Sequence, residues 1–252
     1  MLISFFCEDK SNIYITDSED EEIPAYARMA VSSVVNAIPH SHHKIYRKEE
    51  LRQWIADKYG TSMLLAFDKL VPYAFKADLA RYLLLYEHGG WYFDITIRVI
   101  NGVDVQDQVD MITFLDLPQY SGVSFACNNA IIFSKPKNKI LEFAINLAYS
   151  NIKNAYYGPN CLYPTGPACL GRSVAKLQNN FNVLTGTLMD LTPGFVDKNR
   201  GFVFNDGTLF ALHKPGSRGG DMAYLGAKGT NNYGLLYEQR KIYNEAINIE
   251  DK

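Results

Sequence analysis

The stretch VPYAFKADLARYLLLYEHGGWYFDITIRVI, residues 71–100, sets the fold. Pro72 suits the first turn of a helix, and Gly89 suits the position just after its last turn, so a helix is predicted between them. Its apolar residues recur at helical spacing on two sides, which predicts a helix buried against a sheet. After the double glycine, residues 91–100 alternate with period two, the pattern of a strand.

This alternation gives the predicted strand one apolar and one polar face. The apolar face carries Trp91, Phe93, Ile95, Ile97 and Val99. The polar face carries Tyr92, Asp94, Thr96 and Arg98. Polar residues that follow a helix and a glycine turn at the end of a strand lie where α/β folds usually bind ligands.

Outward from this stretch, helices are expected over 26–39, 48–60, 138–150, 163–177 and 235–248. Strands are expected near 2–6, 60–67 and 128–134. Short strands that alternate with helices predict an α/β domain with a mainly parallel sheet. The 252 residues, 47% of them hydrophobic, suffice for one domain with a large core.

Charge and cysteine content limit the classes of binding partner and the cellular location to be expected. The formal charge is −2, so the basic footprint of a nucleic-acid-binding protein is missing. The first residues lack the pattern of a signal peptide, and no apolar run is long enough for a membrane helix. Four cysteines without a CxxC pair indicate reduced thiols and a cytoplasmic protein. Peripheral attachment to the inner face of a membrane stays open.

Asp78 and Arg81 are three residues apart on the predicted helix and therefore point to one side of it. Charged groups on so apolar a helix are costly unless they are paired or bind something. One interpretation is a structural ion pair. The other is that Asp78 accepts hydrogen bonds from sugar hydroxyls while Arg81 orients it or contacts a phosphate.

Residues 75–96, FKADLARYLLLYEHGGWYFDIT, resemble the DXD sugar-binding glycosyltransferases, family 32, which include bacterial surface-polysaccharide transferases. They also resemble the catalytic cores of clostridial glucosylating toxins. The shared pattern is Asp, Arg three residues on, a leucine-rich run, Gly-Gly, an aromatic residue and Asp-X-Asp. The resemblance is dense from about residue 50 to 175, where NNAIIFSKPKNKIL and the TGP of residues 165–167 also match.

The resemblance implies a GT-A nucleotide-sugar-binding fold, with a Rossmann-like mixed sheet flanked by helices and a loop-rich carboxyl-terminal part. It implies a single domain over 1–252, with a nucleotide-binding half at 1–100 and an acceptor half and lid at 101–252. The expected reaction is a retaining transfer from a nucleoside-diphosphate sugar, a UDP-sugar by preference. The expected acceptor is a saccharide or lipid-linked glycan of a bacterial surface polysaccharide. A toxin-like transfer to protein and a non-catalytic nucleotide-sugar-binding protein are the alternatives.

The same resemblance assigns roles to residues of the motif. Asp78 and Arg81 would hold the donor sugar, and Asp94 would reach the metal or the ribose. Tyr92 would lie near the nucleotide, and Phe5, on the amino-terminal strand, beside the base.

Thr96 departs from the family, which usually has a second, metal-binding aspartate at this place. A neutral hydroxyl is a weak ligand for Mn²⁺ or Mg²⁺. Asp94 could hold the metal with His213, where relatives often carry a metal-binding histidine. Cationic side chains could neutralise the diphosphate instead, or catalysis could be lost. The candidate cations are Arg98, Lys214, Arg218 and Lys228.

Further candidates are weaker. Asn232, with Asn231 beside it, could bind donor or metal from a closing loop, although Gly and Asn also make plain turns. RGGD at 218–221 could be a lid or an ordinary loop. Asp116 and Asp221 could serve as nucleophiles of a double displacement. The alternative is a front-face mechanism, in which the departing phosphate helps to deprotonate the acceptor and no nucleophile is required. The histidines in PHSHHK lack zinc-site spacing and are expected in a surface loop.

Overall fold

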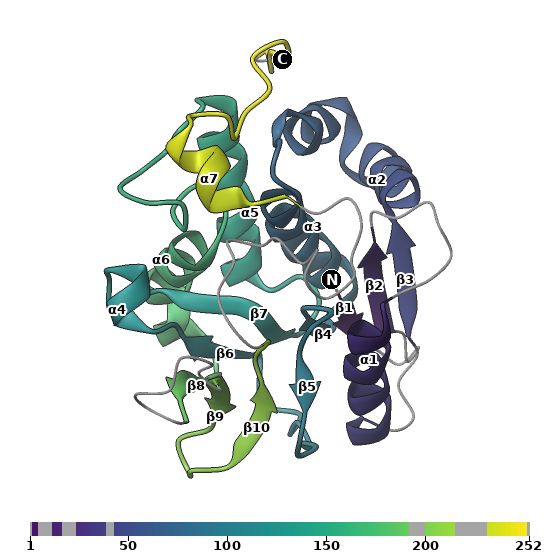
Figure 1. Cartoon of the computed structure of the whole chain (residues 1–252), viewed down its shortest axis with the longest axis vertical. Helices are drawn as coiled ribbons and strands as arrows, with labels where there is room; N and C mark the ends of the chain where they lie inside the picture. The colour runs from purple at the N-terminus through teal and green to yellow at the C-terminus, as the bar shows by residue number, and fades with distance from the viewer. Residues whose placement is uncertain are drawn as a thin grey trace.

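The computed structural model describes residues 2–4, 12–16, 24–38, 43–191, 200–214 and 231–250. Figure 1 shows a twisted sheet with most of the helices on one side of it and α1 on the other. Phe5, His40, His42, Arg218, Asp221 and Lys228 lie outside the described residues.

The elements follow one another in this order: β1 Leu2–Ser4, β2 Asn12–Thr16, α1 Ala25–Ala37, β3 Lys44–Arg47, α2 Lys48–Lys69, α3 Tyr73–His88, β4 Gly90–Phe93, β5 Arg98–Val99, β6 Met111–Leu115, α4 Pro118–Ser121, β7 Cys127–Ser134, α5 Lys139–Lys153, α6 Pro167–Leu177, the 3-10 helix η1 Gln178–Asn180, β8 Val183–Asp190, β9 Arg200–Val203, β10 Leu209–Leu212 and α7 Tyr233–Glu238.

Within the described residues the sheet has ten strands in the order β3-β2-β1-β4-β7-β6-β8-β9-β10-β5. Only the β2–β3 and β6–β8 pairs are parallel. The expectation of a mainly parallel sheet is therefore wrong, and the mixed sheet implied by the family resemblance is confirmed. The reason is that several neighbouring strands are joined by turns or loops rather than by crossover helices, and such strands can pair antiparallel.

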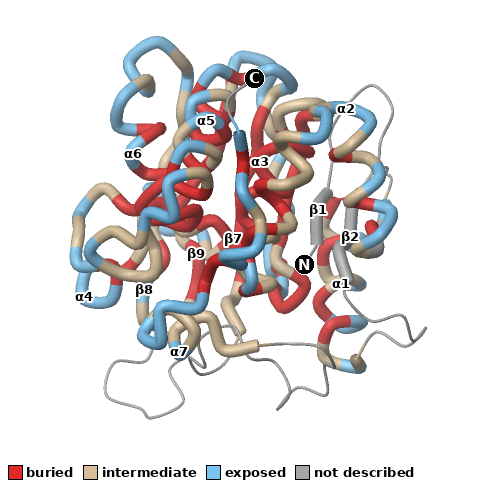
Figure 2. The backbone as a smooth tube through the Cα atoms, turned by 90° about the horizontal axis from the view of Figure 1, so that it is seen from above, coloured by how far each residue is buried: buried red, intermediate tan, exposed pale blue. Residues whose placement is uncertain are grey.

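Two apolar layers cover the two faces of the sheet. One layer packs α2, α3, α5 and α6 against side chains such as Tyr92 and Ile132. The other packs α1 against Trp91 and Phe93, which also contact Phe210 of β10. Figure 2 shows the buried residues concentrated along α3 and β7. The motif helix α3 therefore lies inside the core, as its two apolar sides predict.

Most helices fall where the sequence places them, with three corrections. Gly60, at φ +79°, interrupts α2 where a helix end is predicted, but the chain continues as a helix over 61–69 instead of a strand. Residues 91–100 are two strands joined by a turn, not one. The final helix ends at Glu238, because Arg240 takes a positive φ of 57° that ends the helical path.

Candidate active site

Three polar strand ends meet at one edge of the sheet. In register, Phe93 of β4 pairs with Ile131 of β7, and Leu115 of β6 pairs with Cys127 of β7. Because β7 runs antiparallel to both neighbours, its beginning lies beside the ends of β4 and β6. This places Asp94, which follows β4, and Asp116, which follows β6, on either side of Asn128 and Asn129.

Asp94 lies at the point where β4 stops. Its amide donates to Ala130 O over 2.7 Å, which is the last ladder bond, and its own carbonyl accepts from Ile97 N over 2.9 Å. That second bond closes a turn, and the chain then leaves for β5 at the other end of the strand order. The predicted apolar face holds, since all five of its residues lie in one core layer. The predicted polar face does not: Thr96 is in the turn, buried at 4% exposure, and Arg98 is exposed on another strand.

Arg81 joins the two motif carboxylates. Its guanidinium lies 3.0 Å from Asp78 Oδ1 and 3.5 Å from Asp94 Oδ1, and it donates to the carbonyl of Asn129. It also lies over the ring of Tyr92, 4.3 Å from the centroid. The side chain is only 4% exposed, so these contacts replace water around a buried charge.

Asp78 is held from three sides. Besides Arg81, its carboxylate accepts from Asn129 Nδ2 over 2.8 Å and from Thr165 Oγ1 over 2.8 Å. Gly166 leaves the space for this approach, because a Cβ there would lie 3.3 Å from Asp78 Oδ2. Burial raises the pKa of Asp78 to about 6, against the opposing effects of Arg81 and Thr165. At neutral pH Asp78 is therefore mostly ionised.

The carboxylate of Asp94 is ionised and is open to a ligand from solvent. Burial alone would raise its pKa, but Arg81 and the hydrogen bond from the Tyr92 hydroxyl hold the pKa below its ordinary value, and Lys214 adds to this effect. The side chain is 35% exposed. Within the described residues, the Tyr92 hydroxyl and the Arg81 guanidinium both contact its Oδ1 atom, so Oδ2 remains for a ligand.

Tyr92 is completely buried and covered by Arg81. Its ring is not open to stack on a nucleotide, and its hydroxyl orients Asp94 instead.

The two asparagines near the carboxyl end take structural roles. Asn232 caps α7 by accepting from Leu235 N over 3.0 Å. Asn231 accepts from Tyr73 N over 3.2 Å and so ties this segment to the start of α3. Both amides are already engaged, which makes a helix cap and a tie the roles that the geometry supports.

His213 is the residue that the sequence predicts as the partner of Asp94 for a metal ion. Burial first, and then the charge of Lys214, lower its pKa to about 4, while the charge of Asp94 acts in the opposite sense. The imidazole is thus neutral at physiological pH, as metal binding requires. No group of three or more potential ligands occurs among the described residues. A cation held by Asp94 and His213 would therefore take its other ligands from phosphate and water, a common arrangement for Mg²⁺.

The low pKa of His213 predicts a pH dependence of stability. Between pH 6.5 and about 4 the unfolded chain binds a proton at this residue while the native protein does not, so stability falls as the pH is lowered through this window. His213→Gln is expected to lose less stability than the wild type between pH 7 and pH 5, measured by thermal melting. An equal loss in both proteins would show that His213 titrates normally.

Sequence reasoning missed two residues that complete the network. The side chain of Asn129 donates a hydrogen bond to Asp78, and its backbone carbonyl accepts one from Arg81. The hydroxyl of Thr165 also donates to Asp78. Both lie in segments that resemble the family, but only the fold brings them to α3, across separations of 51 and 87 residues.

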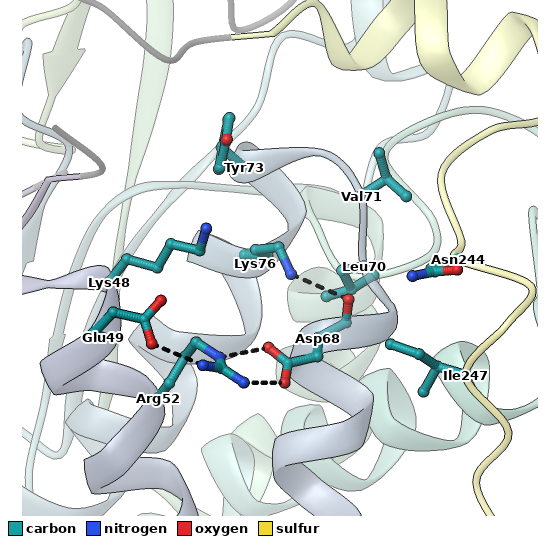
Figure 3. A pocket seen from close by; sticks show the side chains of 10 residues that line it. All are labelled: Lys48, Glu49, Arg52, Asp68, Leu70, Val71, Tyr73, Lys76, Asn244 and Ile247. Atoms are coloured by element: carbon teal, nitrogen blue, oxygen red, sulfur yellow. Dashed lines mark hydrogen bonds and ion pairs between the residues drawn. The ribbon is translucent and has the colours of Figure 1, made fainter. Parts of the chain in front are cut away.

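A separate pocket of about 380 Å³ lies on the other side of the α3 amino terminus (Figure 3). Its cations are engaged: Arg52 pairs with Asp68 at 2.7 Å, and Lys76 donates to Phe67 O over 2.7 Å. None of the residues of the Asp78–Arg81–Asp94 network lines it.

Residues 10–112 match the family described as glycosyltransferase sugar-binding region containing DXD motif. Residues 10–112, about two fifths of the chain, are thus similar to the sugar-binding region of these glycosyltransferases, and they include Asp78, Arg81 and Asp94. Inositol phosphoceramide mannosyltransferase 3 of Schizosaccharomyces pombe is 26% identical over 155 residues, which cover 59% of this chain and 40% of that protein. The chain thus spans about two fifths of the length of this curated relative.

Among solved structures, the chain is similar to PaToxG Glycosyltransferase. The TM-score is 0.47 at 17% identity, over 67% of this chain and 70% of that one. As for membranes, no helix in the described ranges has both the length and the apolar character that a bilayer crossing demands.

Proposed function

We propose that this protein is a glycosyltransferase, which moves a sugar with retention of configuration from a nucleoside-diphosphate donor to a saccharide acceptor. The observation that carries the proposal is the buried Asp78–Arg81–Asp94 network, which ends in an accessible, ionised carboxylate at the sheet edge. Buried charges are expensive, and a protein retains such a network most readily where it binds a polar ligand.

The residues divide the work by position. Asp78 would accept hydrogen bonds from donor-sugar hydroxyls, and Arg81 would orient Asp78 and Asp94. Asp94 and His213 would hold Mn²⁺ or Mg²⁺, which neutralises the diphosphate as the glycosidic bond breaks. Lys214 lies close enough to lower the pKa of Asp94, so its charge would assist at the same phosphates.

The finer features of the proposal come from the sequence. Residues 1–100 would bind the nucleotide of a UDP-sugar, and residues 101–252 the acceptor, a bacterial surface or lipid-linked glycan. A cytoplasmic location belongs to the same proposal, supported by the unpaired thiols of Cys127, Cys161 and Cys169. The mannosyltransferase name of the relative adds nucleotide-activated mannose to the donors to be tested.

A thermal-shift experiment tests donor and metal together. UDP or GDP with Mn²⁺ is expected to raise the melting temperature, because a ligand that binds only the native state stabilises it by RT ln(1 + [L]/Kd). EDTA should abolish most of that shift, and His213→Ala should weaken the metal dependence.

A shift that is equal in Mn²⁺ and EDTA would assign the diphosphate to cations such as Lys214. No shift with any nucleoside diphosphate would refute the transferase proposal.

A further inference from the structure

Asp116 faces the same region of the molecule as the two motif carboxylates. Two adjacent residues at the beginning of β7 show this. Asn128 Nδ2 donates to Asp116 Oδ1 over 3.1 Å, and Asn129 Nδ2 donates to Asp78 Oδ1 over 2.8 Å. Asp116 therefore belongs to the site, although it is not part of the Arg81 network.

The sheet fixes the spacing between Asp116 and Asp94. Their strands, β6 and β4, are separated by β7, and two strand spacings amount to about 10 Å. A retaining transfer without a covalent intermediate brings the incoming hydroxyl to the face of the sugar that the diphosphate leaves. An acceptor would therefore bind at the same strand ends as a diphosphate at Asp94, which is where Asp116 lies.

Asp116 is surrounded by groups suited to a saccharide. Asn128 Nδ2 donates to Asp116 Oδ1 over 3.1 Å and fixes the carboxylate. Burial raises the pKa of Asp116, against Asn128 and the charge of Arg200. Four residues on, Tyr120 is 52% exposed, and Arg200 lies over its ring, 4.6 Å from the centroid.

Arg200 also connects this group to the metal side of the site. Its carbonyl accepts from His213 N over 2.8 Å, and its side chain lies 3.4 Å from Asp190 Oδ1. Carboxylate, amide and an exposed aromatic ring together present hydrogen-bond acceptors, donors and an apolar face, which match the alternating polar and apolar surfaces of a sugar ring.

We propose that Asp116 and Tyr120 form the subsite for the saccharide acceptor, with the Asp116 carboxylate accepting a hydrogen bond from the acceptor hydroxyl. The proposal rests on the proposed function and adds the residues that contact the second substrate. Asn128 and Arg200 are positioning residues: the first orients Asp116, and the second holds the ring of Tyr120.

The test measures binding of methyl α-glucoside, methyl α-galactoside and methyl α-mannoside by saturation-transfer NMR, with and without UDP and Mn²⁺. Asp116→Asn is expected to weaken binding about tenfold or more, the effect of losing a hydrogen bond to a charged group. Tyr120→Ala is expected to weaken it about threefold to tenfold. The melting shift caused by UDP and Mn²⁺ should remain at the wild-type value in both variants.

Two controls separate this role from a structural one. Asp110→Asn changes a carboxylate just before β6, at the opposite end from Asp116, and Phe143→Ala removes an aromatic ring that is 38% exposed on α5. Both should bind the glycosides like the wild type.

Unchanged glycoside binding in Asp116→Asn, or no glycoside binding by the wild type, would overturn the subsite. Loss of the UDP shift in Asp116→Asn would also overturn it, by moving Asp116 to the donor. If no nucleotide raises the melting temperature of the wild type, the proposed function is refuted. The effect of Asp116→Asn on glycoside binding would still test whether Asp116 contacts a saccharide.

Discussion

Asp94→Asn is expected to lower the rate of sugar transfer about 100-fold to 1000-fold. Asparagine keeps the size of the side chain but loses the charge that would hold a cation at the diphosphate. A metal ion contributes several kcal/mol at this step, and each 1.36 kcal/mol corresponds to a factor of ten in rate. Folding should suffer little, because Arg81 keeps its ion pair with Asp78 at 3.0 Å.

The measurement is release of nucleoside diphosphate from the nucleotide-sugar that stabilises the protein best. Asp110→Asn is a matched control: the Asp110 side chain is 29% exposed, against 35% for Asp94, and its pKa is also lowered. Asp110 lies just before β6, at the edge of the sheet away from the site, so its loss should leave the rate near the wild-type value. Wild-type activity in Asp94→Asn would remove Asp94 from the catalytic machinery.

Arg81→Ala is expected to reduce the free energy of unfolding by about 3–5 kcal/mol, the usual cost of removing one member of a buried ion pair. The variant leaves the Asp78 carboxylate, 8% exposed, without its countercharge. It also removes the cation from the face of Tyr92 and the donor to Asn129 O. Urea denaturation measures the loss.

A double-mutant cycle with Asp78→Asn and Arg81→Met separates stability from binding. If the pair is structural alone, the double variant should regain most of the stability and should bind the nucleotide-sugar with Mn²⁺ like the wild type. The donor role predicts regained stability without nucleotide-sugar binding. If the free energy of unfolding of Arg81→Ala falls by less than about 1 kcal/mol, water replaces the guanidinium at little cost.

Both predictions concern residues of the motif at 75–96, which can be recognised in the sequence. The helix ending at Gly89, its burial and the shared side of Asp78 and Arg81 all follow from spacing within sixteen residues. Local periodicity is sufficient for these features, because a helix places residues three apart on one side. The apolar face of residues 91–99 could be predicted for the same reason.

Other features were decided by a turn and by packing that the pattern of residue types does not show. The period-two pattern continues through Asp94 and Thr96, but the chain turns there because the Asp94 carbonyl accepts from Ile97 N. Propensity likewise favoured a strand over 60–67, whereas packing of Ala66 and Phe67 in the helical core layer decided for a helix. Tertiary burial overrides weak local preference in such segments.

The sequence alone thus determined the motif helix and the pair that it carries, since each depends on residues close together in the chain. The tertiary structure decided which residues complete the site. Asn129 and Thr165 reach Asp78 across 51 and 87 residues, and Asp116 comes beside Asp94 through the register of β6, β7 and β4. Strand pairing is a long-range choice, and it is this pairing that gathers the carboxylates at one edge of the sheet.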